Sequence, residues 1–382
     1  IIPSIPFNLF NKAGYTSSSF VFDLSNWDVS EVTTVATMFS SAGYNAKTWS
    51  VGDLSNWQTT SLTTANHMFD YAGANATVFN IGNIGSWDVS KVTVMNSMFG
   101  GSGYFSAEEY YIGDLSQWNT SSVTNINYMF YYAGRKAKVF NIGNLNGWNT
   151  SNITSMYWTF YSAGYSAETF NIGSLSGWDV SKITTMSQLF QDAGYSASEF
   201  VLDLSGWDTS NVTTMANMFN RAGYSASTWS VGDLSEWNTS KLTNISYMFG
   251  SCGYNSALLS LDLSGWDTSK ITNSSYAFSN MGYNSTNLDL NLLVHSELLS
   301  DQNNFVGAKA VDNGILQYAH DFSVATFAAD DLVKVTFYAD DGTTEIDRQA
   351  DFEGNQGKSR FSGGCGIGVS FPGTCYRFLV RW

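Results

Sequence analysis

Few residues of this chain could catalyse a reaction, and they are scattered along the sequence. The histidines are His67, His295 and His320, and no HExxH, CxxC or glycine-rich phosphate loop accompanies them. Hydrolysis needs a nucleophile with its base, or two carboxylates, held together in one cleft. No pattern in the sequence brings such groups together, so we expect a protein that is not an enzyme and uses no cofactor.

Carboxylates do recur at one fixed position of a repeated phrase. They are Asp23, Asp53, Asp114, Asp203, Asp233 and Asp262. Calcium is conceivable for such a row, but its sites need several oxygens converging on one point. Asn83, Asn144 and Ser174 interrupt the row, and no DxDxDG-type loop occurs. We therefore expect hydrogen bonds from these side chains to the backbone, and no metal site.

A row of tyrosines recurs at a second position and is our candidate binding row. It comprises Tyr44, Tyr104, Tyr165, Tyr195, Tyr224, Tyr254 and Tyr283. Ala74 and Arg135 replace the tyrosine in two copies, and Lys136 follows Arg135, so the position tolerates charge and is partly exposed. Exposed aromatic rows stack on sugars or meet another protein. The alternative is that the rings only cover the joint between repeats.

A tryptophan phrase sets the period that positions both rows. The tryptophans are Trp27, Trp57, Trp87, Trp118, Trp148, Trp178, Trp207, Trp237 and Trp266, spaced by 29 to 31 residues. A fixed period of this size indicates a stacked repeat. Each indole lies between apolar residues at one phase, so we expect these tryptophans to form the structural core.

Each repeat divides into a strand, a turn and a predicted helix. Residues 49–54 alternate around a glycine, which is typical of a short strand. Asp28-Val29-Ser30 resembles a helix N-cap, and the apolar residues at 32, 35, 38, 39 and 42 have helical spacing. The pattern predicts an α/β solenoid with one short parallel strand and one helix in each repeat of about 30 residues.

Two copies of the phrase carry a family resemblance. DLSGWDTSNVTTMANMF at 203–219 and DLSEWNTSKLTNISYMF at 233–249 resemble the BspA-like leucine-rich repeats of bacterial surface proteins. The resemblance covers about residues 10–293. It implies a leucine-rich-repeat stack and a role at the cell surface in adhesion. The segment AGYSASTWSVG and its variants lengthen the repeat relative to the common form of that family.

The repeat sets the expected domain boundaries. Residues 1–22 are a cap and partial repeat, 23–293 are nine repeats, 294–325 are a cap and linker, and 326–382 are a small all-β domain. In the last region, 332–338 and 343–346 predict one hairpin, and 366–371 and 376–382 predict another. Cys365 and Cys375 are placed to form a disulfide at the base of the second hairpin.

Composition limits the partners. The net charge is −15, only 13% of residues are charged, and no basic run occurs, which argues against nucleic acid and anionic membranes. No apolar stretch is long enough to span a membrane. The first residue is Ile1 rather than Met, and we expect an extracellular or cell-surface protein whose leader has been removed, with a virion surface as another location.

These observations favour a non-enzymatic protein that presents a rigid surface for adhesion to a protein or glycan at a cell surface. The alternative is a structural subunit of an extracellular filament or virion appendage, which would self-assemble through its ends and its C-terminal β-domain.

Overall fold

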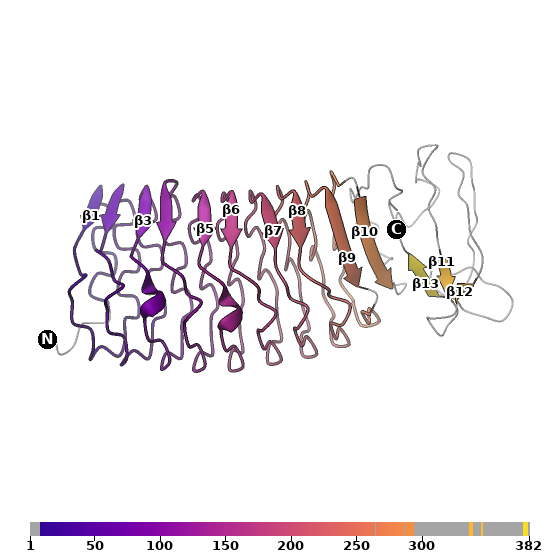
Figure 1. The fold of residues 1–382 in the computed structure, drawn as a ribbon, viewed down its shortest axis with the longest axis horizontal. Coiled ribbons are helices and arrows are strands. Elements are labelled where there is room, and N and C mark those ends of the chain that lie inside the picture. Colours follow the sequence, from indigo (N-terminus) through magenta and orange to yellow (C-terminus); the bar gives the residue numbers. More distant parts are fainter. Residues whose placement is uncertain are drawn as a thin grey trace.

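The computed structural model describes residues 8–263, 265–285, 287–293, 336–338, 345–346 and 377–380. In this part the chain winds into a parallel β-solenoid whose coils stack along one long axis (Figure 1). The predicted α/β leucine-rich-repeat fold with one helix per repeat is wrong. The described residues contain no α-helix, and their helical structure is limited to two single 3-10 turns, η1 (Ile84–Ser86) and η2 (Leu145–Gly147).

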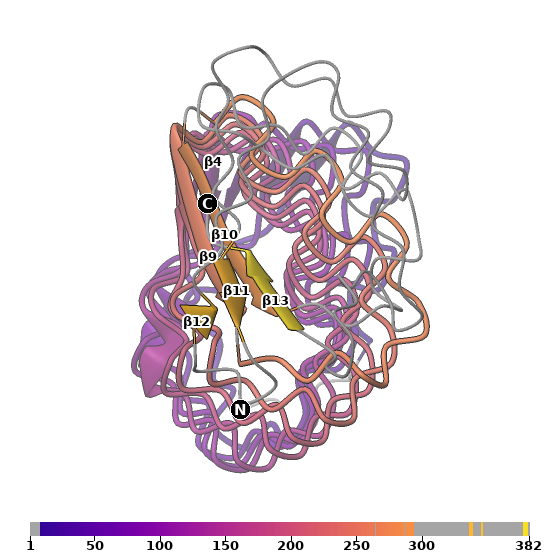
Figure 2. The same ribbon diagram turned by 90° about the vertical axis from the view of Figure 1, so that its right-hand side faces the viewer.

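One strand opens each coil, and in the three-residue strands between residues 19 and 230 the central side chain packs against the core. The strands are β1 (Ser19–Val21), β2 (Thr48–Ser50), β3 (Val78–Asn80), β4 (Glu109–Tyr111), β5 (Val139–Asn141), β6 (Thr169–Asn171), β7 (Glu199–Val201), β8 (Thr228–Ser230), β9 (Leu258–Leu263) and β10 (Asn287–Leu293). These strands pair in parallel within four separate sheets, β1-β2, β3-β4, β5-β6 and β7-β8-β9-β10, as Phe140 of β5 does with Phe170 of β6. Viewed from the end, the strands lie on one side of the stacked coils (Figure 2).

Three C-terminal strands extend the sheet that contains β7 to β10. They are β11 (Thr336–Tyr338), β12 (Glu345–Ile346) and β13 (Arg377–Val380), in the sheet order β12-β11-β13-β10-β9-β8-β7. β11 and β12 pair antiparallel at the position of the first expected hairpin. β13 pairs antiparallel with both β10 and β11. The other expected strand of the second hairpin, at 366–371, and the proposed disulfide of Cys365 with Cys375 lie outside the described residues.

The segment predicted as a helix is instead a pair of four-residue turns. In the first full coil the amide of Met38 donates to the carbonyl of Val35, and the amide of Ala42 donates to Phe39. Thr37 and Ser41, the third residue of each turn, have φ of +56°. This left-handed conformation cannot continue a right-handed helix. Two consecutive four-residue turns place apolar residues at 35, 38, 39 and 42, which is also the spacing of a helix face.

Hydrogen bonds that the turn segment does not make internally go to the next coil. The amides of Thr37, Phe39 and Ser41 donate to carbonyls of residues 66, 68 and 70, at 2.9, 2.8 and 2.7 Å. Along the segment, every second amide therefore bonds to the next coil, and the amides between them bond within the turn segment. The Asx side chain at Asp28 accepts from Ser30, as expected, but starts a turn and not a helix.

An aromatic ladder of strand residues runs from Phe20 to Trp229 with centroids 4.8 to 6.3 Å apart. Two further aromatic ladders fill the interior beside it. Rings of one ladder stack from Phe39 to Phe278 with centroids 5.3 to 5.8 Å apart. The tryptophans form the other; those from Trp57 onward are buried, whereas Trp27 in the first coil is half-buried. Each buried indole of this ladder donates its N–H to a carbonyl of the preceding coil, as Trp148 does to Leu115 at 2.9 Å.

Within the described residues, no helix combines the length and hydropathy that a membrane crossing needs. The stacked coils of the repeat region share one continuous apolar interior.

The indole hydrogen bond gives a prediction for stability. Replacing Trp148 by Phe removes one of the two donors to the buried carbonyl of Leu115, which still accepts from the amide of Trp118, and it also removes ring volume. We therefore expect the free energy of unfolding to fall by about 2 kcal/mol. Urea denaturation followed by circular dichroism measures the change. In the matched control Trp27→Phe, a half-buried ring is changed, and the loss should be smaller. Equal losses in the two variants would contradict the role given to the indole N–H.

Candidate functional site

The predicted tyrosine row forms a stack along one edge of the solenoid. From Tyr165 to Tyr283 the rings lie nearly parallel, with neighbouring centroids 4.4 to 4.8 Å apart. Tyr44 stacks in the same way on Tyr15 of the partial first coil, at 4.9 Å. Each ring is half-buried. Because both faces of an inner ring contact its neighbours, the row offers edges and hydroxyl groups to a partner and few free faces for a sugar.

Arg135 continues this stack where the tyrosine is missing. Its guanidinium carbon lies 5.4 Å from the ring centroid of Tyr104 on one side and 4.3 Å from that of Tyr165 on the other. A planar cation replaces a planar ring, and cation–π attraction holds it there. At the other interruption Ala74 is buried, and Tyr44 contacts Tyr71 at 6.1 Å instead.

A second group of aromatic side chains, which the sequence analysis did not identify, lies on the turn segments beside this row. We call it the aromatic patch; it comprises Tyr71, Tyr128, Tyr131, Tyr132, Tyr157, Trp158 and Tyr161. All seven side chains are half-buried. At the equivalent turn positions the first full coil has only alanine, threonine and serine, at 36, 37, 40 and 41. Other coils carry mixed polar residues here, and Tyr247 stacks on Tyr276, so the patch is the place where aromatic side chains of adjacent coils are most numerous.

The patch is held together by contacts between rings of adjacent coils. The centroid of Tyr131 lies 4.1 Å from that of Tyr132 and 5.3 Å from that of Trp158. Trp158 stacks on Tyr161 at 4.6 Å, and Tyr128 meets Tyr157 edge-on at 5.6 Å. Each of the six patch rings between Tyr128 and Tyr161 thus contacts at least one other, which lowers the entropy cost of presenting it to a partner. Tyr71 contacts Tyr44 of the tyrosine row.

Backbone conformation also positions these rings. Tyr128, Tyr132 and Trp158 have φ of +58°, +57° and +58°, the left-handed conformation that the same turn positions adopt in the other coils, as at Thr37 and Ser41. Gly100-Gly101 separates Tyr71 from the rest of the patch. A Cβ at Gly101 would lie 2.5 Å from the Tyr71 ring, so the absence of a side chain there lets Tyr71 lie across that coil.

Polar groups border the patch on its C-terminal side. The side-chain oxygen of Gln188 accepts from the Tyr157 hydroxyl at 3.1 Å and from the indole N–H of Trp158. In the following coils Asp192, 2% exposed, pairs with Arg221 at 2.8 Å. Burial raises the pKa of Asp192, although Arg221 opposes this shift.

Burial is also the main cause of raised pKa values among the patch phenols. It raises the pKa of Tyr71 to about 12, with the nearby Asp70 carboxylate adding to the shift. It raises the pKa of Tyr161 to about 12 and that of Tyr131 further. These hydroxyl groups are therefore neutral donors at physiological pH, and no phenolate is available as a base.

The other candidate residues have local structural partners. The Asp row forms Asx turns, in which Asp23 accepts from the amide and hydroxyl of Ser25, and these bonds lower its pKa. His67 contacts Asp70 and Asn96, each at 3.0 Å. His295 and His320 lie outside the described residues. In the part of the chain that the structure describes, no three His, Cys, Asp or Glu side chains gather as a metal site would require.

The patch had a sequence signal that we did not use. The phrases NYMFYY at 127–132 and YWTFYS at 157–162 place aromatic residues on both sides of the buried Phe. Aligned on that Phe, the two phrases place these aromatic residues at outward positions of adjacent coils.

Comparison with known proteins gives one family. A family model described as "Mycoplasma protein of unknown function, DUF285" matches residues 8–106, 73–193, 162–290 and 197–318. No curated protein and no solved structure matches the chain.

The raised phenol pKa values give a prediction for alkaline pH. An unfolded tyrosine ionises near 10, so folding favours the neutral phenols of Tyr71 and Tyr161. Their contribution to stability is complete below pH 10 and is lost as the pH rises through about 12. We expect phenolate absorbance to retain a late step near pH 12 that the Tyr71→Phe/Tyr161→Phe variant has lost. A titration with the same shape in both proteins would contradict this.

Proposed function

Because the chain belongs to the DUF285 family, whose description assigns no activity, we propose a function from the geometry of its surface. The protein is a non-enzymatic binding scaffold that is displayed at a cell surface and attaches to a protein or glycan partner through the aromatic patch. The observation that carries this proposal is the replacement of small turn residues by clustered tyrosines and tryptophan in adjacent coils.

The composition of the patch supports binding. Tyrosine, tryptophan and arginine are the residues most enriched at energetic hot spots of interfaces, because they bury much area at little entropy cost. Tyr131, Trp158 and Tyr161 are half-buried and contact one another, with Arg135 at the patch edge 5.5 Å from Tyr132. The tyrosine row contributes mainly as support beside the patch, since its ring faces are occupied by stacking.

The scaffold supports the same proposal. Every coil is joined to its neighbours by backbone bonds and by stacked rings in the interior. Such a rod does not need to become ordered when a partner binds. Display outside the cell is supported by the resemblance of residues 203–219 and 233–249 to BspA-like surface proteins, and by the acidic, weakly charged composition.

The alternative function is a structural subunit that stacks head to tail in a filament or virion appendage. Stacking another copy directly onto the last coil would require β10 to pair with it, although β12 is the edge strand of the described sheet. β13 already pairs with β10 through Leu292 and Leu293, so a stacked copy would have to displace it. We therefore rank this alternative second; light scattering that finds polymers in dilute solution would favour it.

The test of the proposed function replaces the patch by residues found at the same positions of other coils. The variant Tyr131→Ser/Trp158→Ser/Tyr161→Ser is compared with wild type on an array of extracellular-matrix proteins and glycans. We expect wild type to bind at least one member and the variant to bind it at least about tenfold more weakly.

The matched control is Tyr247→Ser, which removes an exposed tyrosine of the same turn position outside the patch. It should bind as wild type does, and circular dichroism should show that all three proteins are folded. The proposal would be refuted if the triple variant kept full binding, or if wild type bound no member of the array.

A further inference from the structure

Charge is separated around each coil. We define the strand side as the strand through the tryptophan turn (48–60 in the second coil) and the turn side as the remainder (61–77). Between residues 19 and 269 the strand side carries carboxylates and no lysine or arginine. They are Asp23, Asp28, Asp53, Asp88, Glu109, Asp114, Asp179, Glu199, Asp203, Asp208, Asp233, Glu236, Asp262 and Asp267.

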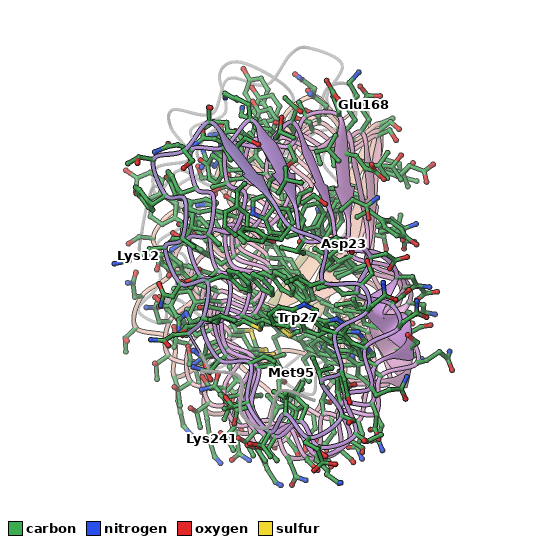
Figure 3. All side chains as sticks on the ribbon, turned by 90° about the vertical axis from the view of Figure 1, so that its left-hand side faces the viewer. Lys12, Asp23, Trp27, Met95, Glu168 and Lys241 are labelled. Atoms are coloured by element: carbon green, nitrogen blue, oxygen red, sulfur yellow. The ribbon has the colours of Figure 1, made fainter. Side chains whose placement is uncertain are left out.

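The cations of the repeat region all lie on the turn side, where the aromatic patch is. They are Lys12, Lys47, Lys91, Arg135, Lys136, Lys138, Lys182, Arg221, Lys241 and Lys270. The carboxylates of the turn side are fewer: Glu31, Asp70, Glu108, Glu168 and Asp192. Figure 3 shows Lys12 and Lys241 on one side of the coil and Asp23 on the other. The patch therefore lies on the side of the coils where cations outnumber carboxylates, with Arg135 and Arg221 beside it and Asp70 and Asp192 as its neighbouring carboxylates.

Among the cations of the turn side, Arg135 is the best placed to bind an anion at the patch, because it lies at the patch edge. The ion pairs that the structure shows within residues 8–285 join His67 to Asp70 and Arg221 to Asp192. Arg135 belongs to neither pair, although the Asp192 carboxylate is near enough to interact with its charge. Its Nε is buried and has no hydrogen-bond partner. Stacking between Tyr104 and Tyr165 holds the guanidinium in one plane, and its edge can receive a carboxylate in the bidentate manner.

The ring arrangement favours a protein partner over a sugar. A sugar stacks on a free ring face, but Trp158 lies nearly parallel to Tyr161, with 14° between the planes, and is 26° from Tyr131. Its indole N–H is also bonded to Gln188. The edges and hydroxyl groups that remain suit contact with apolar and backbone groups of a polypeptide, as in the tyrosine-rich surfaces of protein interfaces.

We infer that the aromatic patch binds a protein segment in which apolar side chains flank an aspartate or glutamate, with that carboxylate bound to the guanidinium of Arg135. This inference rests on the proposed function, because it takes the patch to be the binding surface. It adds the class of partner and the residue that selects it.

The chain itself supplies a conservative test variant. Arg135→Tyr installs the residue found at this position in most coils, so the stack continues from Tyr104 to Tyr165 while the charge is lost. The probe is a library of random peptides displayed on phage and selected on the immobilised full chain. We expect wild type to enrich peptides with an acidic residue between apolar or aromatic residues, and Arg135→Tyr to enrich apolar peptides without the acidic one.

Synthetic peptides of the enriched sequence measure the effect. Binding to Arg135→Tyr should be at least about tenfold weaker than to wild type, and replacing the acidic residue by its amide should weaken binding to wild type but add little in the variant. Lys241→Ser, a cation of the turn side away from the patch, should bind as wild type does.

The outcomes separate this inference from the proposed function. Peptides that require Tyr131, Trp158 and Tyr161 but bind Arg135→Tyr equally well would overturn the inference and leave the proposed function standing. A glycan that binds the patch when no peptide is selected would also overturn it. Selected peptides that bind the Tyr131→Ser/Trp158→Ser/Tyr161→Ser variant unchanged would overturn both.

Discussion

The structure depends on backbone hydrogen bonds that run from one coil to the next. A turn segment with left-handed residues such as Thr37 and Ser41 would be strained and poorly bonded in isolation. Stacking supplies what it lacks, because the amides of these same residues donate to the neighbouring coil. A coil is therefore stable only beside another coil, as in other repeat proteins, where neighbour contacts provide much of the stability.

Once the coils are in register, identical positions lie above one another and side chains form ladders. Inside, stacked phenylalanines and indole N–H bonds join successive coils. On the outside, a substitution at one turn position changes the surface there and leaves the backbone of the coils as it is. Arg135 enters a tyrosine stack in this way, and tyrosines at turn positions gather into the aromatic patch. Local surface chemistry can thus vary while the scaffold remains the same.

The sequence was sufficient for the period, the parallel strands and the burial of the tryptophans from Trp57 onward, because each follows from apolar residues recurring at one phase. It was misleading about the helix. Paired four-residue turns and a helix face have the same apolar spacing, and the left-handed positions carry Thr37 and Ser41 where glycine would have marked a turn. The aromatic patch lies at outward positions of the turn segment, such as 131 and 158, which the recurring apolar residues do not constrain.

The central claim is that the turn segment bonds between coils and not within a helix. Scalar coupling across hydrogen bonds, measured by NMR on the deuterated protein, tests it directly. The amide nitrogen of Phe99 should couple to the carbonyl carbon of Met129 in the next coil, to whose oxygen it lies at 2.9 Å. Coupling of that nitrogen to the carbonyl of Met95, the bond an α-helix would make, would contradict the account.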